Sequence, residues 1–147
     1  MVCVAAVMVA VAGAVLVSLR DGGDGAAARN DVAALSWREV SSRAEGQTVR
    51  LWMWGGEVAL NAYVDEVVVP AAAGAGVTLQ RVPIDDTASA MVRLAVEGGN
   101  GAAMGAIDLV WVNGKNFEQG KAAGLWLQDW VRALPNAGLL PAGDPTL

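Results

Sequence analysis

Thr48 to Trp54 reads TVRLWMW, and this stretch decides the fold class that the sequence predicts. It is a nearly continuous run of apolar, aromatic and β-branched residues, which is typical of a β-strand covered on both faces. Gly55 and Gly56 then break the run, and a helical pattern opens at Glu57. A buried strand, a tight turn and a helix in that order indicate the start of a parallel α/β unit.

Two more strand patterns follow along the chain. Val77 to Val82 reads VTLQRV and Pro83 is expected to close it, while Ile107 to Val112 reads IDLVWV. Helical patterns separate the three strands, so each connection is a crossover of the kind that joins parallel strands. We therefore predict an α/β fold with a parallel, doubly wound sheet.

The helical patterns carry their own start and stop signals. Ser36, with Glu39 three residues later, forms a capping box, and that helix should run to about Ala44. The next helix starts at Glu57 and should kink or end at Pro70. Its apolar stripe comprises Leu60, Val64, Val67 and Val68. The helix that starts at Asp85-Asp86-Thr87 has a stripe of Ala88, Met91, Val92 and Ala95. Two short helices are expected later, at Lys115–Ala123 and Gln128–Ala133.

The first part of the chain reads as a leader. Val2 to Leu19 contains no charged residue, and Arg20 is the first charged side chain. Such a run suits a signal peptide, an uncleaved membrane anchor through residues 2–19 or a buried core helix. The first two are favoured, and both place the body in a periplasmic or extracellular location. The predicted plan is a leader at 1–20, a flexible linker at 21–35 and the folded body at 36–147.

Composition argues against several classes of function. The 147 residues carry a net charge of −5, with 10 Lys and Arg against 15 Asp and Glu and no basic run, which disfavours nucleic-acid binding. There is no histidine, and the single cysteine, Cys3, lies in the leader, so the body lacks the usual general base and a cysteine nucleophile. No dinucleotide motif, phosphate loop or nucleophile elbow occurs. We expect no catalytic residue, no metal and no cofactor.

The candidate site is a small-molecule site at the carboxyl ends of the three strands, where ligands of doubly wound sheets bind. The candidate ligand-binding residues are Trp54, Gly55, Gly56, Asp85, Thr87, Asn113, Gly114 and Asn116. The glycines would let a ligand approach the backbone, Trp54 would stack on it, and the two asparagines would offer amide groups.

These residues have plainer interpretations too. Gly55-Gly56 and Asn113-Gly114 could both be ordinary turns, and adjacent aspartates before a helix are more often caps than metal ligands. The charge of the ligand stays open as well. Trp54 beside Glu57 and the aspartates suits a cation, whereas glycines at a helix start suit an anion.

Two groups of residues stand in an order that resembles a known family. They are Trp54, Gly55, Gly56 and Asn61, and then Asp108, Leu109, Trp111, Asn113, Gly114, Asn116 and Phe117. Over about Trp37 to Asn136 the chain resembles the extracellular solute-binding proteins of ABC transporters, in a branch related to the thiamine- and polyamine-type binders. A strand that ends in tryptophan and two glycines, followed by a helix with an asparagine, is typical of that branch.

The resemblance implies the partial N-terminal lobe of a periplasmic-binding-protein type II-like fold, with the first strand central. It also implies two lobes that close on a solute, of which this chain holds the front part. The implied partners are a small-molecule solute and the ABC permease subunits, with membrane contact only through the leader or the permease. Solute capture for import is therefore the leading prediction. An N-terminally anchored non-catalytic interaction domain or an inactive remnant is the alternative, and a small hydrolase or transferase is disfavoured.

Overall fold

The computed structural model describes residues 35–99, 105–127, 130 and 134–139. The predicted leader at 1–20 and nearly all of the linker lie outside these residues, as does most of the helix expected at Gln128–Ala133. Within the described ranges, no helix combines the length and the apolar character needed to cross a bilayer.

Three parallel strands form the centre of the fold. They are β1 (Thr48–Trp54), β2 (Thr78–Ile84) and β3 (Leu109–Val110), in the spatial order β2-β1-β3. Thr48 pairs with Thr78 at the start of β1, and Leu51 pairs with Leu109 on its other side. The α/β class, the parallel sheet and the central position of the first strand are thus confirmed. The bounds predicted for β1 match the structure residue by residue.

The predicted end of β2 was wrong, because the strand runs through Pro83 to Ile84. The N–H and C=O of one residue in a parallel pair point toward the same neighbour. Ile84 C=O accepts a hydrogen bond from Gly55 N–H at 2.9 Å, so Ile84 points toward β1. The nitrogen of Pro83 therefore points toward the side of β2 that pairs with no described strand, where a missing N–H breaks no ladder hydrogen bond.

The third strand is much shorter than the predicted Ile107–Val112. Only Leu109 and Val110 are paired as strand residues. Just before them the Asp108 carboxylate accepts a hydrogen bond from Arg50 N–H at 2.8 Å, so a side chain satisfies a backbone donor of β1. After them, pairing ends with a bond of 2.8 Å from Trp111 N–H to Trp52 C=O.

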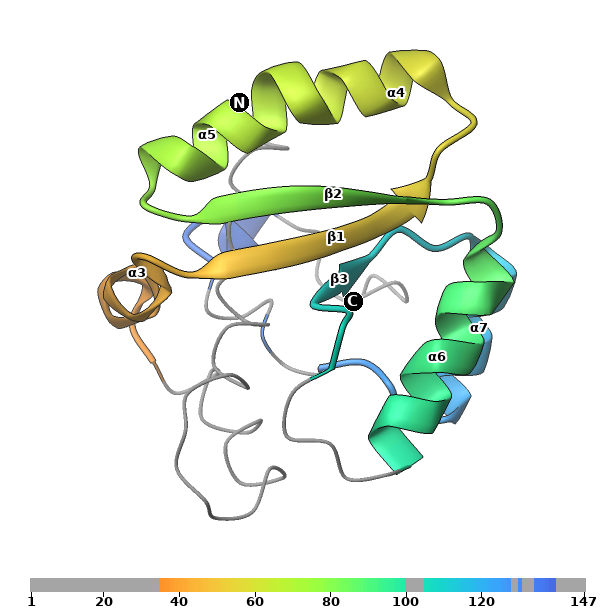
Figure 1. The fold of residues 1–147 in the computed structure, drawn as a ribbon. Helices are drawn as coiled ribbons and strands as arrows, with labels where there is room; N and C mark the ends of the chain where they lie inside the picture. The colour runs from red at the N-terminus through yellow and green to blue at the C-terminus, as the bar shows by residue number, and fades with distance from the viewer. Residues whose placement is uncertain (1–34, 100–104, 128–129, 131–133, 140–147) are drawn as a thin grey trace.

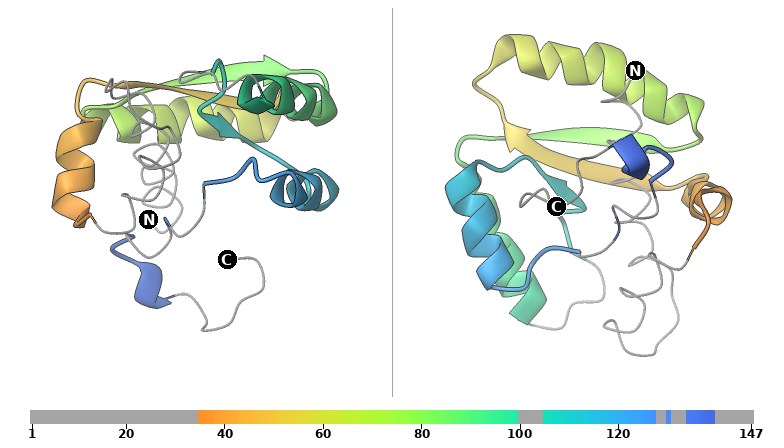
Figure 2. Two further views of the ribbon diagram at one scale, coloured as in Figure 1. Left: turned by 90° about the horizontal axis from the view of Figure 1, so that it is seen from below. Right: turned by 180° about the vertical axis from the view of Figure 1, so that it is seen from behind.

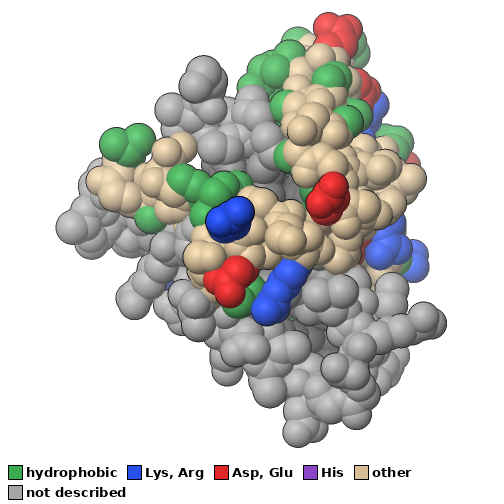
Figure 3. Space-filling view, turned by 90° about the vertical axis from the view of Figure 1, so that its left-hand side faces the viewer, with side chains coloured by type: hydrophobic (Ala, Val, Ile, Leu, Met, Phe, Trp, Pro, Cys, Tyr) green, Lys and Arg blue, Asp and Glu red, His purple; other side chains and the backbone are tan. Residues whose placement is uncertain are grey.

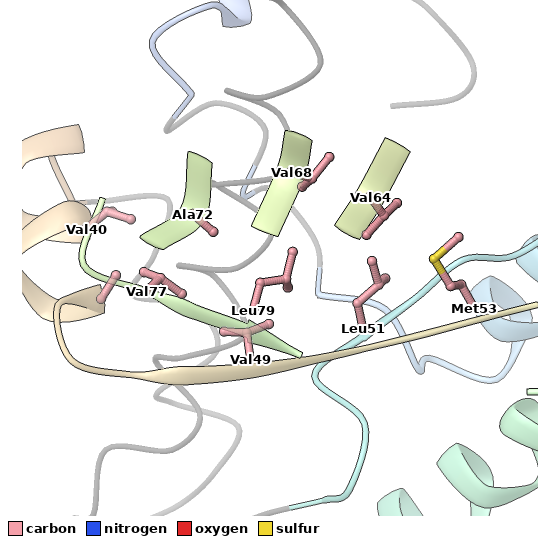
Figure 4. Close-up of a cluster of buried hydrophobic side chains, with 10 residues drawn as sticks. Val40, Val49, Leu51, Met53, Val64, Val68, Ala72, Val77 and Leu79 are labelled. Atoms are coloured by element: carbon pink, nitrogen blue, oxygen red, sulfur yellow. The ribbon is translucent and has the colours of Figure 1, made fainter. Parts of the chain in front are cut away.

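One face of the sheet carries the main core (Figure 4). Val49, Leu51 and Met53 alternate along β1 and are buried, while the residues between them are half-buried. They face the long helix that joins β1 to β2, which contributes Val64, Val68 and Ala72. The prediction that β1 is covered on both faces holds fully for this face of the strand. Its second face is only partly covered.

The long helix consists of three consecutive segments, α4 (Val58–Tyr63), the π-helical η2 (Val64–Val68) and α5 (Val69–Gly74). It lies along the sheet in Figure 1. Pro70 does not end the helix as predicted, but the π-helical turn directly before α5 is a local departure from α-helical geometry. In the π-helical turn Val69 N–H bonds to Val64 C=O. The predicted stripe holds for Leu60, Val64 and Val68, but Val67 is exposed.

Helix α6 (Thr87–Gly99) follows β2 and lies toward the second face of the sheet. Its predicted core stripe was wrong except for Met91, because Ala90 and Met91 are the buried pair and Val92 is 66% exposed. Two charged side chains explain the rotation of the helix. The Arg93 guanidinium lies 5.2 Å from the Trp52 ring centroid, and the Glu97 carboxylate accepts from Ala106 N–H at 2.9 Å. Both contacts turn the polar side of α6 inward.

The remaining helices flank the sheet at its two ends (Figures 1 and 2). Helix α3 (Trp37–Ala44) begins with the predicted capping box between Ser36 and Glu39, and Gly46 follows with a φ of 78°. Helix α7 (Gly114–Ala122) lies beside α6, and the one-turn η4 (Ala137–Leu139) lies toward α3 in Figure 2. Figure 3 views the α3 end, where acidic and basic side chains are interspersed among the described residues.

Candidate functional site

The structure brings the ends of the three strands to one edge of the sheet. The end of β2 is tied to the end of β1 by the Gly55–Ile84 hydrogen bond, and β3 is tied to β1 by the Trp111–Trp52 bond. Because these bonds fall at or beyond the last paired residues, the turns that follow the strands start close together. The predicted residues Trp54, Gly55 and Asp85 therefore lie at one edge.

The two glycines after β1 are in close contact with their neighbours. The Trp54 indole folds back over Gly56, so that a methyl group at position 56 would overlap the ring. A methyl group at Gly55 would lie 3.2 Å from Cβ of Pro83, which is tighter than an ordinary van der Waals contact. The structure thus supplies a packing reason for both glycines. The half-exposed indole of Trp54, at 50%, forms the outer surface of this turn.

Asn61, in α4, braces the same turn from inside. Its side-chain amide nitrogen donates a hydrogen bond of 2.8 Å to Gly55 C=O, and the side chain is only 7% exposed. Its Oδ1 atom is buried without a hydrogen-bond partner in the described part of the chain. Asn61 was named only within the family motif and not as a site residue. An asparagine in the first turns of a helix that follows a glycine pair was the available signal.

The acidic residues after β2 act as a helix start. Asp86 Oδ1 accepts from Ala88 N–H at 3.1 Å, and the Ser89 hydroxyl donates to Asp86 C=O at 2.6 Å. Thr87 is the first residue of α6 and is half-buried, while Asp85 is exposed. The capping interpretation is confirmed for Asp86. Among the described residues, no group of three or more acidic, cysteine or histidine side chains is placed to hold a metal ion.

The Asn113-Gly114 turn after β3 also starts a helix. Asn113 is the N-cap of α7, and its Oδ1 accepts a hydrogen bond of 3.1 Å from Asn116 N–H. This bond uses the amide oxygen of Asn113, so the cap does not need its amide nitrogen. Asn113 and Gly114 are exposed, and Asn116 is half-buried. The two asparagines are therefore brought together, through a capping contact.

Trp111 is a candidate that the site prediction missed. It directly follows β3, and its side chain is 50% exposed, the same fraction as Trp54. Two half-exposed indoles thus stand at the ends of adjacent strands. The signal was present in the sequence, since a tryptophan at the end of the pattern IDLVWV is expected to emerge where the strand leaves the sheet.

A polar network fixes the position of β3 and hence of Trp111. The Arg50 guanidinium pairs with Asp108, Nε to Oδ2 at 2.9 Å, and also donates to Gly105 C=O at 2.9 Å. The Trp52 indole nitrogen donates to Ala106 C=O at 3.2 Å. Residues 105–108 are therefore held against β1 by two of its side chains.

Glu97 fastens the same segment from α6. Partial burial by itself would raise the pKa of Glu97, but hydrogen bonds from Arg93 and from Ala106 N–H outweigh it. The charges of Arg93 and Arg50 act in the same direction, so the pKa of this carboxyl lies below its ordinary value. Glu97 is therefore ionised at neutral pH and anchors the segment before β3.

The described residues form an α/β domain with a small parallel sheet and two half-exposed indoles at its carboxyl edge. The chain matches no protein-family model and no solved structure. It is similar to the protein YnjB of Escherichia coli K12, with 38% identity over 104 residues. The match covers 70% of this chain and 27% of YnjB, so the chain spans little more than a quarter of that relative.

Proposed function

We propose that this chain is the sheet-bearing part of a solute-binding protein that captures a small molecule outside the cytoplasm and delivers it to an ABC import permease. One observation carries the proposal. Trp54 and Trp111, each 50% exposed, stand at the carboxyl ends of two adjacent parallel strands. Large exposed indoles are expensive to leave in water, and this edge is where α/β sheets bind ligands.

In this proposal the residues at the edge have different roles. The outer face of the Trp54 indole stacks on the solute, and Gly56 seats the ring by leaving room beneath it. Asn61 holds the turn through Gly55 C=O. The side-chain amide nitrogen of Asn113 is a donor toward the solute, because its oxygen is already used to cap α7. Asp85 supplies a polar contact from the end of β2.

The finer fold assignment belongs to the same proposal. A central first strand and a long helix on one face suit an N-terminal lobe of the periplasmic-binding-protein type II kind. Helix α6 toward the other face suits a doubly wound sheet. One such lobe contacts a solute from one side only, so this chain by itself should bind weakly. The similarity to YnjB is compatible with a longer protein that supplies the other side.

The proposed role is binding without catalysis. The whole chain has no histidine and its single cysteine is Cys3, so the residues at the edge offer amides, carboxylates and indoles. These groups suit recognition of a solute by stacking and hydrogen bonds.

A calorimetric titration of a solute panel tests the proposal. Thiamine, spermidine, amino acids and small organic anions are titrated into the purified chain, together with Trp111→Ala and Leu139→Ala variants. Leu139 is a matched control because it is 73% exposed but lies in η4, far from α6 and α7 (Figure 2). We expect a panel member to bind weakly to the wild type and to Leu139→Ala, and more weakly still to Trp111→Ala. Absence of binding across the panel, or equal binding by all three proteins, would contradict the proposal.

A further inference from the structure

Helix α6 exposes an apolar stripe that the described part of the chain leaves uncovered. The α6 stripe consists of Ala88, Val92, Ala95 and Val96, which recur at helical spacing on one side of the helix. Val92 is 66% exposed and Val96 is 57% exposed. The opposite side of α6 is occupied by Ala90 and Met91 in the core and by Arg93 over Trp52.

The stripe has the pattern of a buried helix face. Its spacing is the one by which amphipathic helices bury a side, and it is built of alanine and valine without a charged member. The helix cannot bury this stripe by rotating. Such a rotation would break the contacts of Arg93 with Trp52 and Glu97, and the hydrogen bond between Glu97 and Ala106. A contiguous exposed apolar stripe on a fixed helix marks a contact surface.

The comparison with YnjB indicates what covers the stripe. A match of 104 residues cannot be placed in a chain of 147 without including α6, so the helix belongs to the part shared with YnjB. That shared part is 27% of YnjB, which leaves nearly three-quarters of that protein as polypeptide available to pack on it. An apolar stripe of small side chains suits close packing by another helix or strand.

We propose that the α6 stripe is the docking face for polypeptide from the part of a YnjB-length protein that lies outside the matched segment. The small side chains at positions 88 and 95 allow close approach, and Val92 and Val96 form the apolar contact. This assignment does not depend on the solute. It concerns how the domain joins the rest of a longer protein, and it holds or fails whether or not the strand-end edge binds a ligand.

Cysteine labelling compares the same face in the two proteins. Single cysteines are placed at position 92 and, as a control, at position 66 of this chain after Cys3→Ser. They are also placed at the aligned positions of YnjB, in which any native cysteine is first replaced by serine. Glu66 is exposed on the long helix, and its position also falls within any placement of the match. In this chain, Val92→Cys and Glu66→Cys should react with a maleimide at similar rates.

In YnjB the cysteine aligned with Val92 should react about tenfold more slowly, or slower still, than the one aligned with Glu66, as expected for a site that opens only transiently. Equal rates in folded YnjB would overturn the proposal. Slow reaction of Val92→Cys in this chain would also overturn the proposal, because the stripe would then already be covered. A labelling rate that rises on dilution would mean that a second copy covers the stripe. A labelling rate that does not change on dilution would mean that this chain's own residues cover it. If a YnjB variant fails to fold, amide hydrogen exchange on the unmodified proteins tests whether α6 is covered. Slower exchange of α6 in YnjB than in this chain, relative to the long helix, supports the proposal, and unchanged exchange contradicts it.

Discussion

The indole of Trp54 lies directly on the backbone of Gly56, two residues further along the chain, and leaves no room for a side chain at position 56. The contact holds the ring over the turn that ends β1, with half of its surface in solvent. A glycine at position 56, which would ordinarily be explained by backbone freedom, thus has a packing reason in its aromatic neighbour. Gly56 determines where Trp54 presents its outer face.

Replacement of Gly56 by alanine tests this relationship. The added methyl group must displace the indole, so we expect the emission of Trp54 to shift. We expect destabilisation of about 1–2 kcal/mol, toward the lower end for overpacking, because the ring can move into solvent. Fluorescence difference spectra against a Trp54→Phe background measure the shift, and thermal melting measures the stability.

Gly74→Ala is the matched control for this substitution. Gly74 ends α5 and has open space where a Cβ would stand, so alanine should leave the spectrum unchanged and keep or raise the melting temperature. An unchanged Trp54 spectrum in Gly56→Ala would show that the ring does not rest on the glycine.

The Arg50–Asp108 pair should matter more for stability than the Arg81–Asp65 pair, which also joins two separate elements. Asp108→Ala removes the partner of a half-buried guanidinium and a hydrogen bond to β1, which should cost about 1–3 kcal/mol. It should also speed amide exchange at Trp111, whose N–H bonds to Trp52. Chemical denaturation and hydrogen exchange measure the two effects.

Asp65→Ala provides the comparison, because Asp65 pairs with Arg81 at the surface with nearly half of its side chain exposed. Exposed pairs contribute about 0–1 kcal/mol. If the two variants lose the same stability, the network around Asp108 does not anchor β3.

Acid should weaken the link between α6 and the segment before β3. The folded-state pKa of Glu97 lies below its ordinary value of 4.5, so its contribution is complete at higher pH and is lost as the pH falls through the folded value. The wild type should therefore melt above Glu97→Gln at neutral pH, and the two melting temperatures should converge as the pH falls below 4.5 and through the lower folded-state pKa. A gap in melting temperature that stays constant from neutral to acid pH would contradict this assignment.

The residues show why some parts of the fold were predictable and others were not. The bounds of β1 and the capping box at Ser36 depend on residues a few positions apart. Such elements can be predicted because they do not require contacts with distant parts of the chain. The end of β2 depended on which edge of the sheet Pro83 faces, which only the strand order determines. The length of β3 depended on a carboxylate, Asp108, that takes over a backbone donor of another strand.

The same distinction applies to α6 and to the site. Two stripes of α6 are apolar, and contacts of Arg93 and Glu97 with residues far away in sequence decide which one is buried. At the carboxyl edge, the strand ends were predicted to meet because parallel topology requires it. The contact of Trp54 with Gly56 and the bracing by Asn61 are side-chain arrangements that no spacing rule specifies.

The uncharged run Val2–Leu19 predicts that the folded body reaches a compartment outside the cytoplasm. A C-terminally tagged chain expressed in a Gram-negative bacterium should appear in the periplasmic or membrane fraction. Replacing two valines of the run by arginines should retain it inside the cell, since charge disrupts insertion of the apolar segment. Full-length soluble protein in the cytosol, with the run intact, would contradict the prediction.

The most direct test of solute capture is a binding titration of Trp54→Ala, carried out beside its melting curve without ligand. The ring is half-exposed, so its removal should lower the melting temperature only slightly while weakening the affinity for a solute that stacks on it, by about tenfold for a contact of this kind. The account predicts reduced affinity together with nearly unchanged melting. Unchanged affinity in a folded Trp54→Ala variant would show that the carboxyl edge of the sheet is not the solute site.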